Sequence, residues 1–223
     1  MQSFKEIYDR AADRKGGAAA MEVLIAEHKP KTRAELGAIP DDRWLSRMSQ
    51  GVFQAGFSWK VIQNKWPGFE VAFDGFDPRI CAAMSDDKFD ELLKDKSIVR
   101  NAAKILAVRD NGIFLVDLAR EHGSAAAFFA DWPDSDFVGL LKVLKKRGSR
   151  LGGGAAMWVM RNMGKPSFVL SRDVVAALIG AGVVDKEPSG KREMQAVQGA
   201  FNAWAEESGR DLTAISRVLA MSV

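Results

Sequence analysis

The sequence predicts an all-α protein. Strand-like alternation is nearly absent, apolar residues recur at the three- and four-residue spacing of helices with one buried face, and short segments containing Gly or Pro separate these stretches. With 47% hydrophobic and 27% charged residues over 223 positions, the composition is that of a globular protein. This length suffices for one large core or two smaller lobes.

The N-terminal half contains short amphipathic helices. They are expected at residues 19–28, 41–56, 58–67, about 77–84 and about 86–95. Pro30 and Pro67 are expected to end two of them, because proline interrupts a helix interior. Ser58 is the expected N-cap of the third helix, and an Asp is expected to cap the second. The second helix is expected to turn one apolar face inward, formed by Trp44, Met48, Val52 and Phe53.

The C-terminal half has longer helices. They are expected at residues 96–123, 135–147, 155–163, 171–180, 193–209 and 212–221. The first is the longest and is expected to kink at Gly112. Its expected apolar members are Ile98, Ala102, Ile105, Leu106, Ile113, Leu115 and Leu118. The helix 135–147 ends in three cations and Gly148, which suits the negative end of its dipole and a glycine stop.

Composition excludes several classes of protein. Cys81 is the single cysteine, and His28 and His122 lie far apart, so neither a disulfide nor a metal site is expected. No cofactor is expected either. No apolar run reaches the roughly 20 residues that span a bilayer, and the first residues lack a signal-peptide core, so we expect a cytoplasmic protein. The net charge of +3 is too small to indicate a nucleic-acid partner by itself.

A glycine-rich turn lies between two of the expected helices. In Arg150-Leu151-Gly152-Gly153-Gly154 the backbone amides can turn toward one point without Cβ obstruction, and a helix N-terminus follows. This arrangement favours an anion, and the preceding cations could follow a phosphodiester backbone. The cations are Lys142, Lys145, Lys146, Arg147 and Arg150, with Lys165 further on. The alternative interpretation is a plain glycine connection beside a solvated basic face.

The segment from Arg150 to Val174 resembles the helix-hairpin-helix motif of the DNA glycosylase superfamily, whose hairpin grips the DNA backbone. It departs from that motif twice: Ala155 replaces the second hairpin glycine, and Ser171 stands where many members keep a catalytic aspartate. Asp173, two residues later, is the remaining catalytic candidate. Its alternative role is structural, at the start of a helix that Ser171 caps.

A second set of motifs resembles one branch of that superfamily, the DNA-3-methyladenine glycosylase I family. Its members share the pattern Q-A-G-[LF]-S-W, then F-D-P, then I-x-[RN]-[NH]-x-x-K-I, and the same order occurs here. The matching segments are Gln54–Trp59, Phe76–Pro78, Ile98–Asn101 and Lys104-Ile105. With the hairpin, the resemblance covers roughly residues 45 to 180.

The resemblance implies a base pocket and a side chain that fills the gap left by a flipped nucleotide. Trp59 would stack on the base, and Phe57 on the Gly56 turn would fill the gap, although either ring could instead pack in the core. Gly51 stands where the family has its lesion-recognising glutamate, which leaves Gln54 and Gln50 as polar groups. Helical spacing predicts that three residues share one face, as a pocket wall or a plain polar edge: Arg100, Asn101 and Lys104.

The resemblance therefore implies a helix-hairpin-helix DNA glycosylase fold with two helical lobes around a cleft. Residues 46–165 would form one lobe, and residues 1–45 with 166–223 the other. The implied function is base-excision repair by a monofunctional, monomeric hydrolase that removes an alkylated purine such as N3-methyladenine from double-stranded DNA. The family's zinc ligands have no counterparts. Alternatives are a non-catalytic lesion-binding protein that keeps the hairpin grip, and an interaction protein that does not contact DNA.

Overall fold

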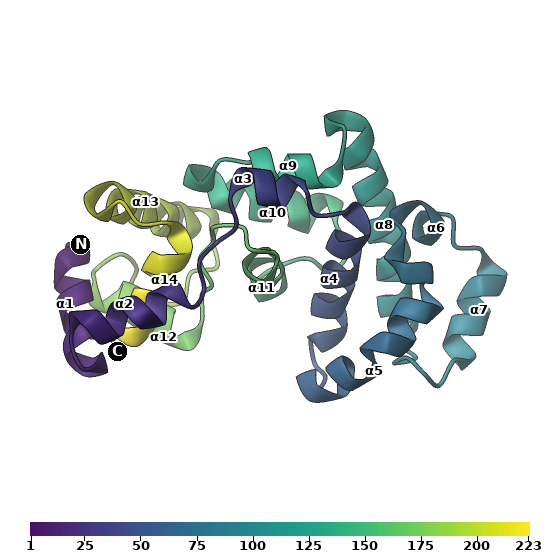
Figure 1. Cartoon of the computed structure of the whole chain (residues 1–223), viewed down its shortest axis with the longest axis horizontal. Coiled ribbons are helices and arrows are strands. Elements are labelled where there is room, and N and C mark those ends of the chain that lie inside the picture. The colour runs from purple at the N-terminus through teal and green to yellow at the C-terminus, as the bar shows by residue number, and fades with distance from the viewer. The chain divides into compact units, whose positions relative to one another are not determined.

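The computed structural model describes residues 1–223 and contains helices joined by short connections, without a β-strand (Figure 1). The all-α prediction is confirmed. The chain forms two compact units: residues 1–31, 133–140 and 164–223 make the first, and residues 32–132 with 141–163 make the second. No helix is both long and apolar enough to cross a lipid bilayer.

The first unit packs its helices around the last one. Its helices are α1 (Phe4–Lys15), α2 (Ala18–Ala26), the short η2 (Asp134–Asp136), α12 (Arg172–Gly180), α13 (Lys191–Ser208) and α14 (Leu212–Met221). α14 contacts α1, α2, α12 and α13. A chain of ring contacts fills the core, from Phe137 through Phe168 and Phe201 to Trp204.

The second unit is built around two helices, α4 and α8. Its helices are α3 (Arg33–Gly37), α4 (Asp41–Gln54), α5 (Trp59–Ala72), η1 (Asp74–Phe76), α6 (Pro78–Ala82), α7 (Asp86–Lys94), α8 (Ala102–His122), α9 (Ala125–Asp131) and α11 (Gly154–Met163). α10 (Phe137–Arg147) contributes residues to both units. α4 contacts α5, α8 and α11, and Figure 1 shows it between α11 and α8.

Most of the expected helices are present, but α1 was missed. Its composition is polar, yet it carries a complete capping box, since Ser3 accepts from the Glu6 amide and Glu6 accepts from the Ser3 amide. α3 and α9 were also missed. Short helices such as these depend on their neighbours for stability, because few turns offer little intrinsic helix stability.

Several local predictions are corrected. Pro67 does not end α5, because packing of the neighbouring Trp66 and Phe69 rings in the aromatic core holds the helix through the proline. The Asp expected to cap α4 serves a different helix, since the Asp41 carboxylate accepts from the amides of Ala125 and Ala126 at the start of α9.

α8 also differs from its prediction. It begins at Ala102, with Asn101 as N-cap, and runs unbroken past Gly112. Gly112 is needed for close packing instead, since a Cβ there would lie 3.0 Å from the Ala82 nitrogen and the Pro78 oxygen of α6. Ile113, expected inside, is exposed. The inward residues of α4, in contrast, are buried as predicted.

Candidate nucleic-acid interface

The connection between α4 and α5 is a tight turn that carries exposed aromatic rings. We call residues Gln54–Trp59 the aromatic turn. Ala55 has φ −63° and ψ 113°, Gly56 has φ +77°, and the Phe57 amide donates to the Gln54 carbonyl at 3.2 Å. These are the features of a type II β-turn, whose third position favours glycine. Phe57 is 40% exposed and Trp59 is 50% exposed, so neither ring is a core residue.

The side chain of Lys104 fixes the aromatic turn. Its side chain is buried, and its ammonium donates to the carbonyl oxygens of Phe53 at 3.2 Å and Ala55 at 2.5 Å. A cation at the last carbonyls of α4 complements the negative end of the helix dipole. The ammonium also lies 4.5 Å from the centre of the Phe57 ring, within cation–π range. Burial, and secondly the charge of Arg150, lower the pKa of Lys104.

The hairpin, residues 148–154, joins α10 to α11. Leu151 points into the core, whereas Gly153 and Gly154 are exposed and have open space where a Cβ would lie. Arg150 and Gly153 have φ values of +58° and +56°, so two left-handed residues shape the connection. A Cβ at Gly148 would lie 2.7 Å from the Leu144 oxygen, so this glycine is required sterically.

Asn111 anchors the hairpin, a role that the sequence did not predict. Its amide nitrogen donates to the Ser149 carbonyl at 3.1 Å, and its amide oxygen accepts from the Ser149 amide at 2.8 Å. Asn111 is fully buried in the middle of α8. The sequence does contain one indication of this role, because Asn111 is a polar residue on the apolar face of the helix between Val108 and Leu115. Such a residue needs a hydrogen-bonding partner.

The first turn of α8 connects the hairpin to the aromatic turn. Arg150 donates to the Ala103 carbonyl at 3.3 Å, while the next residue, Lys104, holds Phe53 and Ala55. The two elements are therefore fixed to adjacent residues of one helix. Arg100 and Asn101 precede α8, so the predicted helical face does not exist. Asn101 accepts from the Lys104 amide as N-cap, and Arg100 is exposed.

Cations border the hairpin. Lys145, Lys146 and Arg150 are exposed and form no ion pair with a carboxylate. Arg147 is instead held by Glu121, with two hydrogen bonds of 2.8 and 2.7 Å. Lys165, which the sequence suggested as a phosphate contact, is buried and pairs with Asp134 at 2.8 Å.

The face of α4 that carries Gln50 and Gly51 is closely covered. A Cβ at Gly51 would lie 2.8 Å from a methyl carbon of Val159, so α11 fills the space into which a larger side chain would project. Gln50 accepts from Arg47 at 2.5 Å. Burial lowers the pKa of Arg47, which forms no ion pair. Gln54, the last residue of α4, is half-buried.

Asp173 belongs to the other unit. It is exposed in the first turn of α12, and Ser171 is the N-cap that accepts from the Val174 amide at 3.3 Å. The structural role considered for Ser171 is therefore confirmed. No group of three or more His, Cys, Asp or Glu side chains lies together where it could hold a metal ion.

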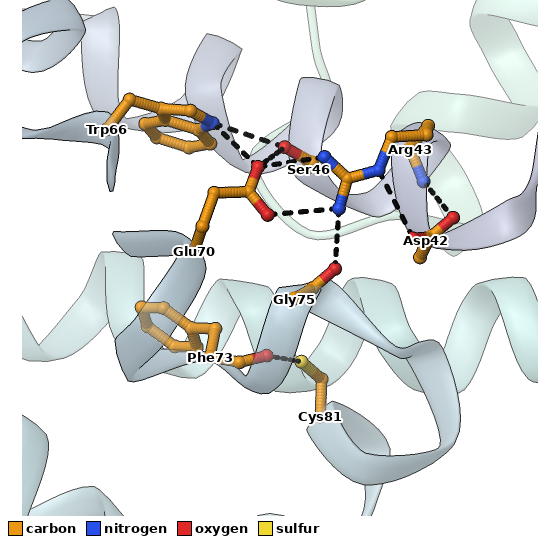
Figure 2. Close-up of polar contacts among 8 residues, drawn as sticks. All are labelled: Asp42, Arg43, Ser46, Trp66, Glu70, Phe73, Gly75 and Cys81. Carbon is orange, nitrogen blue, oxygen red and sulfur yellow. Dashed lines mark hydrogen bonds and ion pairs between the residues drawn. The ribbon is translucent and has the colours of Figure 1, made fainter. Parts of the chain in front are cut away.

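A polar network holds η1, which ends at Phe76 of the F-D-P segment. Figure 2 shows the Glu70 carboxylate accepting hydrogen bonds from Arg43, Ser46 and Trp66, while Arg43 also donates to the Gly75 carbonyl at 2.7 Å. Burial raises the pKa of Glu70, but these hydrogen bonds outweigh it and keep the pKa below its usual value. The network holds η1 against α4 and α5. A hollow of about 840 Å³ lies beside it, lined by none of the predicted base-pocket residues.

The fold is that of the all-α DNA glycosylases of the helix-hairpin-helix type. A Methanocaldococcus jannaschii 8-oxoguanine glycosylase/lyase, solved with DNA containing 8-oxoguanine, has a similar fold over 96% of this chain and 95% of its own, with a TM-score of 0.53 and 13% identity. A crystal structure of 3-methyladenine DNA glycosylase I covers 61% of this chain and 82% of its own, with a TM-score of 0.50 and 25% identity.

The sequence match is narrower and more specific. The family model for methyladenine glycosylase matches residues 38–141. DNA-3-methyladenine glycosylase 1 of Escherichia coli (strain K12) is 30% identical over 118 residues, which are 45% of this chain and 63% of that protein. The match thus spans less than two thirds of the relative's length. Residues 38–141 are thus similar to the methyladenine glycosylase family, the family that the sequence motifs resemble.

Proposed function

We propose that the protein is a monofunctional DNA glycosylase. It would flip a damaged nucleotide out of double-stranded DNA and hydrolyse the N-glycosidic bond of an alkylated purine such as N3-methyladenine. The match of residues 38–141 to the methyladenine glycosylase model and the name of the Escherichia coli relative support this activity. The proposed partner is duplex DNA with a damaged base, which a monomer of the protein would bind in the cytoplasm.

The observation that carries the proposal is the exposed Phe57 on a turn that a buried lysine fixes. A large apolar ring gains stability when it leaves water, yet this one is held outside the core. A flipped nucleotide leaves a gap in the base stack that a rigid ring can fill, which offsets part of the unstacking cost. Phe57 would fill this gap, and Gly56 would let the backbone approach the DNA.

The hairpin would grip the DNA backbone. Gly152, Gly153 and Gly154 lead into the N-terminus of α11, where backbone amides and the helix dipole favour a phosphate. The exposed Lys145, Lys146 and Arg150 would neutralise neighbouring phosphates. Three segments of the second unit that contain or adjoin the hairpin and the aromatic turn have no Asp or Glu at all: residues 43–69, 96–109 and 141–163. This separation of charge favours an anionic partner at this end of the unit.

The chemistry requires little acid catalysis. Methylation at N3 makes adenine cationic, so the base leaves as a neutral molecule when its bond to the sugar breaks. As this bond breaks, the sugar becomes cationic and needs electrostatic stabilisation. Water then adds to the sugar carbon and releases one proton to the solvent or to a nearby carboxylate. Asp173 is the proposed carboxylate. Gly51 offers no charge, so stacking on Trp59 and polar contact with Gln54 would select the base. Lys165 is buried and paired with Asp134, so this lysine is a poor candidate for the nucleophile of a lyase step.

The test is release of free base. Duplex DNA treated with a methylating agent is incubated with the protein, and the released bases are separated by chromatography. We expect N3-methyladenine from the wild type, none from Trp59→Ala, and undiminished release from Val71→Ala, an exposed apolar residue at the other end of α5. If the wild type binds the duplex but frees no base, the lesion-binding alternative replaces the enzyme. Absence of both binding and release would favour a protein that does not contact DNA.

A further inference from the structure

Two tryptophans from different segments meet on the surface of the second unit. Trp59 is the first residue of α5, and Trp158 is on α11, one turn after the hairpin. Their ring centroids are 6.1 Å apart, and the ring planes are at 88°. Trp59 is 50% exposed and Trp158 is 40% exposed, so the pair is not a core contact. Exposed large apolar surface of this kind marks a binding site more often than a single scattered residue does.

The perpendicular arrangement creates a corner. A flat aromatic molecule can stack on the open face of one indole while its edge contacts the other ring, and both stacked and edge-to-face contacts are favourable for aromatic rings. Neither indole N–H of this pair has a hydrogen-bond partner in the protein, whereas the half-buried Trp66 donates to Ser46 and Glu70, and the buried Trp204 donates to the Gln2 carbonyl. The corner therefore offers ring faces together with free donors for the nitrogen and oxygen acceptors of a heterocycle.

The charge around the corner fits an anionic ligand. Lys60 follows Trp59 in sequence and is exposed, and Lys104 lies under the neighbouring Phe57. The segments of the second unit that carry both tryptophans, residues 43–69 and 141–163, contain no carboxylate side chain. A flat heterocycle attached to a negatively charged backbone matches these features, and a nucleotide has both parts. A purely apolar partner would not require the cations.

We propose that Trp158, together with Trp59, forms the seat for one unstacked nucleobase of a bound DNA strand. This inference rests on the proposed function and adds a residue to it, because Trp158 would be the second aromatic surface that a displaced base contacts. Trp158 lies one turn after Gly154, so the hairpin that would bind the DNA phosphates and the ring that would stack on the base are close together on one helix. The seat would bind any of the DNA bases, because every base has a face on which it can stack.

The test uses binding and does not require catalysis. A duplex with one extrahelical 2-aminopurine, whose fluorescence falls when it stacks on an indole, is titrated alongside the same duplex without the bulge. We expect Trp158→Ala to weaken binding of the bulged duplex about tenfold, or about 1.4 kcal/mol, with loss of the fluorescence change. Binding of the fully paired duplex should remain unchanged. Trp158→Phe should retain most of the affinity, because it keeps a stacking face, and Val71→Ala should behave as the wild type.

Three results would overturn the inference: equal affinity of Trp158→Ala and the wild type for the bulged duplex, an equal loss for both duplexes, or an unaltered fluorescence change. Trp158→Leu keeps apolar contact with Trp59 without a flat ring, so it replaces the alanine variant if the latter unfolds. The outcome is separable from base release. If the wild type binds the bulged duplex through Trp158 but frees no base, the base seat is supported and the proposed enzyme activity is not. If the wild type frees base and Trp158→Ala binds the bulged duplex as tightly as the wild type, the enzyme activity is supported and the seat is not.

Discussion

The replacement Lys104→Met tests how the aromatic turn is held. Methionine has a similar length but cannot donate to the carbonyls of Phe53 and Ala55, and it removes the cation beside the Phe57 ring. A hydrogen bond from a charged donor contributes about 1.5–3 kcal/mol. Two effects reduce the loss on substitution. Ala55 is exposed, so its carbonyl can accept a hydrogen bond from water instead, and the methionine variant avoids the cost of burying an ammonium group. We therefore expect a net loss of about 2 kcal/mol, or about 4–8 °C in Tm.

Thermal unfolding and base release are the assays. Lys104→Met should lower Tm, and it should reduce base release more than binding of undamaged duplex, because the mispositioned Phe57 acts only once a nucleotide is flipped. Lys60→Met removes an exposed lysine from the first turn of α5 and is the matched control. A Lys104→Met protein with wild-type Tm and wild-type release would refute the idea that Lys104 holds this turn.

The same variant gives a pH-dependent readout. The pKa of Lys104 in the folded protein lies below its ordinary value of 10.5, because of burial and then the charge of Arg150. Between the folded pKa and 10.5 the unfolded chain binds more protons than the folded chain, so folding stability rises with pH in that window. Lys104→Met lacks this contribution. The stability advantage of the wild type over the variant should thus grow as pH rises through that window, and a constant difference would contradict the assignment.

Three other replacements probe the hairpin and α4. Asn111→Ala should cost about 1–3 kcal/mol of stability by leaving Ser149 without its partners. It should also weaken duplex binding, although Asn111 is buried and does not itself contact DNA. Unchanged unfolding and unchanged binding would contradict this role. Gly51→Glu should destabilise the protein through collision with Val159, and a double-mutant cycle with Val159→Ala should recover part of the loss, whereas strictly additive effects would argue against the contact. Lys145→Ala should make the dependence of log affinity on log salt shallower by about 0.9, and an unaltered slope would remove this lysine from the DNA interface.

The sequence predicted the helices whose apolar spacing is strong. α4 is an example, because Trp44, Met48 and Val52 lie at four-residue spacing and are all buried. The hairpin and its basic surroundings were also recognisable, since glycines at a helix start have a local meaning. Helix ends were less predictable. α5 continues through Pro67 and α8 starts late, at Ala102 after the N-cap Asn101, because ring packing and side-chain capping decide these ends.

The contacts that build the site join residues that are distant in sequence, so the sequence alone did not predict these contacts. Asn111 and Ser149 are paired across 38 positions, and nothing local to either residue indicates the other. Lys104 was recognised as part of a motif, but its hold on α4 becomes visible only when the two helices are packed. The exposure of Phe57 and Trp59 was left open by the sequence, because aromatic residues at helix starts usually bury their rings.

A crystal structure of the protein with a duplex that contains a stable abasic-site analogue would test the mode of DNA binding most directly. We expect the Phe57 ring inside the base stack opposite the analogue, and the backbone amides of Gly152–Gly154 within hydrogen-bond distance of phosphate oxygens. Lys104 should keep its contacts with the carbonyls of Phe53 and Ala55. DNA bound to another surface, or a Phe57 ring that stays outside the duplex, would contradict both the grip and the flipping mechanism.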